Sequence, residues 1–282
     1  MPLYLCSLNS GSNANCYYIG NRDEAVLIDT GLSCRETERR MRQRGLEMEK
    51  VKAIFISHEH SDHITGMPGL SKKYRIPVYI TNGTFVNSNM PMEEDQLCSF
   101  KHASPVRIGA LTITPFKKSH DAADPHSFMV SAHGVNVGVI TDIGYACKKV
   151  INYFGQCHAA FLESNYCPEM LRNGSYPYHL QKRISSDEGH LSNHQALELF
   201  QHYRSPELEL LILSHLSKNN NSPETVEKLF APHAGGVNVV VASRYEAGEI
   251  FTIEDKEVPK EVMKTRKKAL KGLKNENQLS LF

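Results

Sequence analysis

The sequence places three histidines and an aspartate directly after a short apolar run, in the stretch Ile54-Phe55-Ile56-Ser57-His58-Glu59-His60-Ser61-Asp62-His63. The apolar run begins one residue earlier, at Ala53, and residues 53–56 predict a buried strand. Side chains two apart in an extended segment point the same way, so His58 and His60 share one direction. Asp62 and His63 can face a second point nearby. Imidazole and carboxylate groups are ligands that zinc and related ions prefer. The spacing therefore favours two adjacent metal ions over a surface loop that is merely rich in histidine.

Four other polar residues follow apolar runs and could reach the same site. They are Asp29, His120, Asp142 and His215. Taken singly, each has an ordinary interpretation as a capping aspartate or a histidine at a solvated strand end. Taken together with the first stretch, they form a candidate set of metal ligands.

Strand-like and helix-like runs alternate along the chain, which predicts an α/β (α+β) fold. The predicted strands are residues 3–8, 16–19, 25–28, 53–56, 78–80, 111–116, 127–131, 135–140, 158–162, 208–213 and 237–241. The predicted helices are residues 33–44, 145–154, 180–186, 193–203 and 223–230. Ser192 and Ser222 are predicted N-caps, and His133-Gly134 predicts a hairpin turn.

Composition describes a globular chain with one basic end. The 282 residues are 40% apolar and carry a formal net charge of +1, which is enough apolar material for a full core. Seven scattered cysteines without a Cys-x-x-Cys pair, and no apparent signal peptide or membrane-spanning run, predict a cytoplasmic protein. We expect a domain over residues 1–254 and a basic appendage over residues 255–282. Such a segment is typical of a nucleic-acid arm and nearly as often of a solvated helix face.

The motifs resemble those of the metallo-β-lactamase fold superfamily. They are Asp29 in Leu-Ile-Asp-Thr-Gly, His58-x-His60-x-Asp62-His63, His120, Asp142 and His215. The resemblance covers residues 1–250 and implies a four-layer αββα sandwich with a metal site at one edge of the two sheets. It implies that His58, His60 and His120 hold one metal ion and that Asp62, His63 and His215 hold the other. It also implies that Asp142 bridges the two ions and that Asp29 supports the ligands. Zinc and manganese both suit this set.

A residue pair and a wider set of motifs resemble particular branches of this superfamily. Glu163 and His190 resemble the Glu/His pair of the transfer-RNA 3′-processing branch, in which the histidine assists the leaving oxygen and the glutamate orients the histidine. A wider set is similar to the bacterial WalJ/YycJ-type family: Ser10-Gly11-Ser12-Asn13-Ala14-Asn15-Cys16, Glu163-Ser164-Asn165-Tyr166, Met170-Leu171, Gly189-His190-Leu191-Ser192-Asn193 and Ser214-His215-Leu216-Ser217-x-Asn219-Asn220. That family implies a cytoplasmic 5′→3′ DNA exonuclease associated with repair. Cys167 departs from it, because the family commonly has aspartate there.

These resemblances predict a dinuclear metal phosphodiesterase that releases 5′-phosphate products. Asp62 is expected to orient the attacking hydroxide in addition to binding metal. Residues directly after His215 are expected to contact phosphate. They are Ser217, Lys218, Asn219 and Asn220.

The last five residues predict a protein partner. They are Gln278, Leu279, Ser280, Leu281 and Phe282. They resemble the pentapeptide with which bacterial repair and replication proteins bind the DNA sliding clamp. In that mode Gln278 forms hydrogen bonds in a pocket while Leu281 and Phe282 fill an apolar one. Five such residues also occur by chance.

The sequence is also compatible with other functions. An RNA-processing endonuclease of the same fold is the first alternative, and a small-molecule hydrolase such as a thioesterase or lactamase is the second. Asp142 at the bridging position and the missing signal peptide disfavour a lactamase, whereas Glu163, His190 and the terminal pentapeptide disfavour a thioesterase. A non-enzymatic, clamp-tethered DNA-binding adaptor is disfavoured by the intact ligand set.

Overall fold

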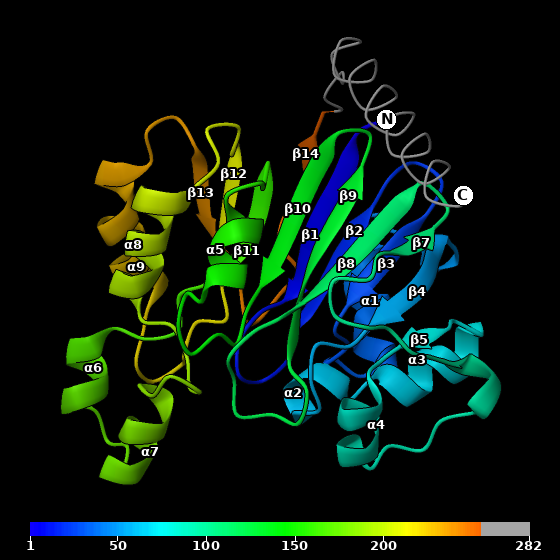
Figure 1. The fold of residues 1–282 in the computed structure, drawn as a ribbon, viewed down its shortest axis with the longest axis horizontal. Coiled ribbons are helices and arrows are strands. Elements are labelled where there is room, and N and C mark those ends of the chain that lie inside the picture. The colour runs from blue at the N-terminus through cyan, green and yellow to red at the C-terminus, as the bar shows by residue number, and fades with distance from the viewer. Residues whose placement is uncertain (255–282) are drawn as a thin grey trace, which may run out of the picture.

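Two seven-stranded sheets pack face to face in the computed structural model, which describes residues 1–254 (Figure 1). The first sheet has the order β14-β1-β2-β3-β4-β5-β6. Its strands are β1 (Leu3–Asn9), β2 (Cys16–Gly20), β3 (Ala25–Ile28), β4 (Val51–Phe55), β5 (Val78–Tyr79), β6 (Leu97–Cys98) and β14 (Phe251–Ile253). The second sheet has the order β13-β12-β11-β10-β9-β8-β7. Its strands are β7 (Val106–Ile108), β8 (Leu111–Lys117), β9 (His126–Ala132), β10 (Val135–Ile140), β11 (Ala159–Glu163), β12 (Leu210–Ser214) and β13 (Asn238–Val241).

Helices cover the outer face of each sheet (Figure 1). The first sheet is covered by α1 (Cys34–Gln43) and α3 (Met67–Tyr74), and the second by α5 (Lys148–Phe154), α8 (Asn193–Tyr203) and α9 (Pro223–Phe230). The other helices are α2 (Ser61–Ile64), α4 (Asn82–Ser88), α6 (Pro168–Asn173) and α7 (Tyr178–Ile184). One apolar cluster, which includes Phe55, Phe128 and Phe161, fills the space between the sheets. A second and a third cluster lie beneath the helices. This layering confirms the predicted αββα sandwich.

Local sequence signals determine several of these elements. The bounds of β3, β10, α8 and α9 are those predicted. Ser192 caps α8 in a reciprocal capping box with Gln195, and Ser222 caps α9. His133 and Gly134 both have positive φ, as a two-residue hairpin turn requires.

One predicted helix starts too early. The chain reaches a helical conformation only at Lys148, since Cys147 is an extended N-cap residue. Residues 141–147 form a loop that carries Asp142 instead. Four short helices, α2, α3, α4 and α6, were not predicted. Short helices depend on tertiary packing more than on propensity. In α3 the first turn contains Pro68 and Gly69, two residues that normally indicate a turn or loop.

Strand pairing brings the loops of the site to one edge of the sandwich. In the first sheet β3 pairs in parallel with β4, with Ile28 opposite Phe55. In the second sheet β10, β11 and β12 are parallel, and Leu162 lies between Ile140 and Leu213. The carboxyl ends of parallel strands meet at the same edge of a sheet. The residues after these strands therefore converge.

The predicted appendage cannot be compared with the structure. The basic appendage at residues 255–282, with its terminal pentapeptide, lies outside the described residues, so the division at residue 254 stays a prediction. Within residues 1–254, no helix is long and apolar enough to cross a membrane.

Candidate metal centre

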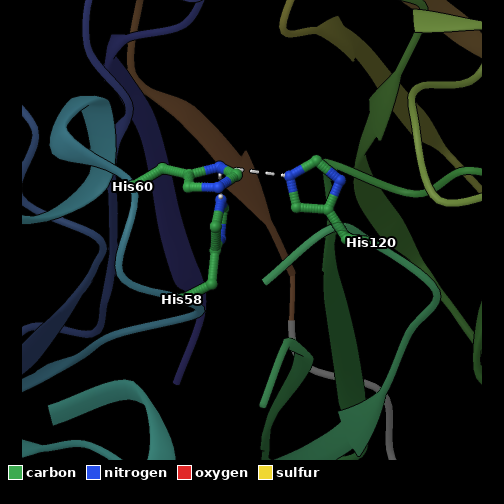
Figure 2. A group of neighbouring side chains, drawn as sticks. All are labelled: His58, His60 and His120. Atoms are coloured by element: carbon green, nitrogen blue, oxygen red, sulfur yellow. Dashed lines mark hydrogen bonds between the residues drawn. The ribbon is translucent and has the colours of Figure 1, made fainter. Parts of the chain in front are cut away.

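Three histidines form the first ligand cluster. Figure 2 shows the rings of His58, His60 and His120 turning nitrogen atoms toward one another. His60 Nδ1 lies 3.1 Å from His58 Nε2 and 3.3 Å from His120 Nε2. The opposite nitrogens of two rings are already engaged, because His58 Nδ1 lies 2.9 Å from Ser57 Oγ and His120 Nδ1 lies 3.0 Å from the carbonyl oxygen of Gly189. The three facing nitrogens are therefore available to one metal ion.

The second cluster combines one carboxylate with two imidazoles. Asp62 and His63 lie on α2, and His215 follows β12. Asp62 Oδ2 lies 3.4 Å from His63 Nε2 and 3.7 Å from His215 Nε2. Candidate ligand atoms of these three residues lie within 4.8 Å of one another. This is the group of ligands that the sequence resemblance implies for a second ion.

Asp142 lies between the two clusters. Its Oδ2 is 3.4 Å from His63 Nε2, and its Oδ1 is 3.4 Å from His215 Nδ1 and 3.9 Å from His120 Nε2. Within residues 1–254, Asp142 Oδ2 and His215 Nε2 are buried atoms without a hydrogen-bond partner. Buried polar atoms are rarely left unpaired. The unpaired atoms therefore fit a pair of divalent ions with Asp142 between them.

Asp29 contacts the side of His63 that faces away from the proposed metal ions. It follows β3 with a φ of 59°, in the left-handed region. One oxygen, Oδ1, accepts a bond from the backbone N–H of Ser57 at 2.8 Å, and Oδ2 lies 2.7 Å from His63 Nδ1. Ser57 Oγ also donates to Oδ2 at 2.8 Å. Since Nδ1 of His63 is occupied, its Nε2 faces the centre, as the predicted role of Asp29 requires.

The pKa values of four histidines at the site shift in two opposite directions. Burial lowers the pKa of His58 well below its ordinary value and the pKa of His120 to about 3, so both rings are neutral. Burial would also lower the pKa of His215, but the surrounding carboxylates, chiefly Asp142, raise it to about 10. The pKa of His63 is likewise raised well above its ordinary value. The carboxylates thus draw positive charge to the second cluster, where divalent ions would replace these protons.

Glu163 joins the predicted acid pair to the metal ligands. Its Oε1 lies 2.8 Å from His190 Nδ1 and 2.9 Å from His215 Nδ1. Its Oε2 accepts bonds from the backbone N–H groups of Ile143 (2.7 Å) and Leu191 (3.2 Å). Burial would raise the pKa of Glu163, but the charges and hydrogen bonds of the two histidines lower it to about 2. Glu163 is therefore an ionised acceptor that orients both rings, a second role that the sequence did not predict.

Three further residues support the centre without having been predicted. Asn15 Nδ2 donates to Asp62 Oδ2 and lies equally close, at 3.1 Å, to His63 Nε2. Asn165 Nδ2 donates to the carbonyl oxygen of His215 at 2.8 Å. The buried Lys118 donates to the carbonyl oxygen of Thr141 at 2.7 Å, beside Asp142. Asn15 and Asn165 stand inside motifs that resemble the family, which was the one signal that could have identified them.

The four residues expected to contact phosphate separate into different environments. Lys218 is exposed, and Ser217 donates its backbone N–H to the carbonyl oxygen of Asn165 at 2.8 Å. Asn219 donates to the hydroxyl of Tyr176, and Asn220 is buried. The carbonyl oxygen of Asn220 accepts the backbone N–H of Cys167 at 2.8 Å. Cys167 itself is the N-cap residue of α6 and lies outside both ligand clusters.

The fold and the ligand clusters define the class of protein. Residues 24–216 match the family described as the β-lactamase superfamily domain, so the chain belongs to the metallo-β-lactamase fold superfamily. Among solved structures, the metallo-β-lactamase fold protein YhfI from Bacillus subtilis is similar with a TM-score of 0.70 at 18% identity, over 89% of this chain and 99% of YhfI.

Sequence comparison with two proteins identifies the family within this superfamily. The chain is 33% identical over 260 residues to exodeoxyribonuclease YycJ of Bacillus anthracis, which covers 90% of this chain and 96% of the relative. It is 30% identical over 253 residues to exodeoxyribonuclease WalJ of Streptococcus pneumoniae, with coverage of 88% and 92%. Within the superfamily the chain therefore belongs to the YycJ/WalJ exodeoxyribonuclease family, and it is a metal-dependent nuclease. This confirms the resemblance found in the motifs.

The position of Glu163 generates a prediction about metal affinity. In Glu163→Gln the side chain loses its charge and keeps one acceptor oxygen, so it cannot accept from both the backbone N–H groups and the imidazoles. The hydrogen bond that orients His215 is therefore weakened or lost. We expect divalent metal affinity to fall about 10- to 100-fold. The measurement is a titration of Zn²⁺ against a competing chelator. The control is His190→Ala, which removes the other imidazole and leaves His215 in place. Equal affinities of Glu163→Gln and wild type would contradict the supporting role.

Proposed function

We propose that this nuclease is a dinuclear 5′→3′ DNA exonuclease that acts in DNA repair and releases 5′-phosphate products. The observation that carries the proposal is the His190–Glu163 pair, which lies directly beside the two ligand clusters. The similarity to exodeoxyribonucleases over most of the chain supports DNA as the substrate. The seven unpaired cysteines support the predicted cytoplasmic location.

His190 is positioned to donate a proton. Its Nδ1 is engaged by Glu163, so Nε2 is the nitrogen that remains for the substrate. The His190 side chain is 20% exposed, whereas that of His215 is 2% exposed. In phosphodiester cleavage this nitrogen would protonate the leaving 3′ oxygen, which leaves the phosphate on the 5′ side of the next nucleotide.

Asp62 is the other group that reaches the substrate side. Its side chain is 19% exposed, and Oδ2 is held by Asn15. A carboxylate in this position can accept a hydrogen bond from the attacking water while it also binds metal. His58, His60 and His120 would hold one ion, Asp62, His63 and His215 the other, and Asp142 both. When bound, such ions supply Lewis-acid chemistry and neutralise charge on the phosphate.

The proposed ligand set predicts two ions per chain. The two clusters share Asp142, so both should fill in the same range of metal concentration. Elemental analysis of protein that was purified without chelator and loaded with Zn²⁺ or Mn²⁺ should find close to two. A fully loaded stoichiometry of one would contradict the bridging role of Asp142.

The acid role predicts a loss of turnover without a loss of metal. We expect His190→Ala to reduce kcat by roughly 10²–10⁴-fold, the usual contribution of a general acid. The assay uses single- and double-stranded DNA and RNA labelled at either end, with metal content measured in parallel. Shortening from the 5′ end of DNA, with 5′-phosphorylated products, supports the proposal. Cleavage of RNA alone, or loss of metal in His190→Ala, would overturn it.

We propose in addition that residues 278–282 bind the bacterial sliding clamp. The proposal rests on the sequence of this segment, in which Leu281 and Phe282 supply an apolar pair. Deletion of the pentapeptide should leave cleavage of short oligonucleotides intact and abolish binding to purified clamp. Leu281→Ala with Phe282→Ala should cost several kcal/mol, in the manner of anchor residues. The measurement is a titration of the full-length and truncated proteins with clamp. Equal binding by both, or none by either, would remove the clamp as a partner.

A further inference from the structure

A pocket of about 350 Å³ lies beside the metal centre and is lined by none of the proposed metal ligands. Three loops form most of its wall, together with parts of α9 and β13. The loops are the β1–β2 loop with Ser10, the β12–α9 loop with Ser217 and Lys218, and the β13–β14 loop with Arg244 and Tyr245. The volume falls within the range of about 300–1,000 Å³ that is typical of small-molecule sites. The pocket touches the centre directly, because Ser10 Oγ accepts the backbone N–H of His215 at 2.7 Å.

Arg244 is fixed at this pocket by uncharged partners. It donates to the carbonyl oxygen of Leu216 at 3.3 Å and to Asn13 Oδ1 at 3.2 Å. Neither partner neutralises the guanidinium. The second cation, Lys218, is exposed, and Glu227 on α9 is the acid among the lining residues. Two cations against one carboxylate give this pocket a positive charge that suits phosphate.

Tyr245 adds an aromatic surface next to this charge. The residue is 69% exposed, and the Arg244 guanidinium carbon lies 6.0 Å from its ring centre. Its backbone is held on both sides, since its N–H donates to Ser243 Oγ at 3.1 Å and its carbonyl oxygen accepts from Arg40 at 2.8 Å. A fixed backbone with an uncovered ring is what a stacking platform for bases requires.

We infer that this pocket binds one nucleotide of the DNA strand next to the scissile phosphate. Arg244 and Lys218 contact the phosphate, and Tyr245 stacks on the base. The inference rests on the proposed function, because it takes a DNA strand as the substrate of the neighbouring centre. Phosphate contacts and stacking read no base edges, so the pocket binds any of the four bases and confers no sequence specificity.

The test is a coupling measurement between protein and DNA. The probes are phosphorothioate-linked single strands that carry a 3′ fluorophore and resist cleavage, each with one abasic nucleotide at a different position. Wild-type, metal-loaded protein should bind about tenfold more weakly when one particular nucleotide is abasic. Tyr245→Ala should bind the intact strand about tenfold more weakly and be insensitive to the abasic site at that position. Tyr245→Phe, which keeps the ring, should behave as wild type.

Control variants distinguish the loss of stacking at Tyr245 from a general loss of DNA affinity. Tyr203→Ala removes another exposed tyrosine, at the end of α8, and should bind as wild type. Lys218→Ala should reduce the slope of log affinity against log salt by about one. Lys101→Ala, which removes an exposed lysine between β6 and β7 that does not line the pocket, should leave the slope unchanged. If no abasic position is coupled to Tyr245, or if Tyr245→Ala and Tyr203→Ala bind alike, the inference is overturned.

Cleavage of labelled DNA decides the proposed function separately. Coupling to Tyr245 without DNA cleavage would keep the pocket as a nucleotide site and refute the exonuclease. Cleavage without coupling would refute the pocket and keep the exonuclease.

Discussion

The burial of carboxylates at the junction of the two sheets is the constraint on which the site depends. Asp29, Asp142 and Glu163 are at most 1% exposed. An uncompensated charge in such a place costs several kcal/mol, so each carboxylate must find donors or cations. Asp29 and Glu163 find backbone N–H groups and imidazoles, and these bonds fix which nitrogen of each ring faces the centre. The need to satisfy buried acids thus determines the geometry of the proposed metal ligands.

The backbone at the site is held in unfavourable conformations by hydrogen bonds within the first sheet and between the sheets. Asp29, Asp142 and His215 have φ values of 59°, 53° and 58°. Each such residue costs on the order of 1–3 kcal/mol and persists only where the surroundings determine it. The N–H of Asp29 donates to the carbonyl oxygen of Phe55 in the first sheet, and the N–H of His215 donates to Ser10 across the sandwich. Pairing within the first sheet therefore keeps Asp29 in place, and packing of one sheet on the other keeps His215 in place.

The alternating runs of the sequence predicted an α/β fold, and the resemblance to a family predicted the sandwich and the assignment of the ligands. The convergence of the candidate ligands has a physical reason. Candidates that follow strands must meet when the strands are parallel. Parallel pairing of β10 with β11, and of β11 with β12, brings Asp142, Glu163 and His215 to one edge. The sequence did not predict that one oxygen of Glu163 serves two imidazoles. That contact depends on how β11, β12 and the loop before α8 lie in space, and no local pattern encodes their relative position. The contact of Asn15 with the candidate ligands was not predicted for the same reason, because its partners lie 47 and 48 positions away.

The segment before α8 couples the proposed acid to the first ligand cluster. The carbonyl oxygen of Gly189 lies 3.0 Å from His120 Nδ1 and so orients that ring. The next residue is His190, whose backbone N–H donates to the carbonyl oxygen of Ile184 at 2.8 Å. Asp121, the neighbour of His120, receives a bond from Arg183 in α7 at 2.6 Å. One segment thus fixes both a proposed metal ligand and the proposed proton donor. The position of the proposed proton donor relative to the His120 ring is therefore set within a single loop, and a displacement of that loop would disturb both at once.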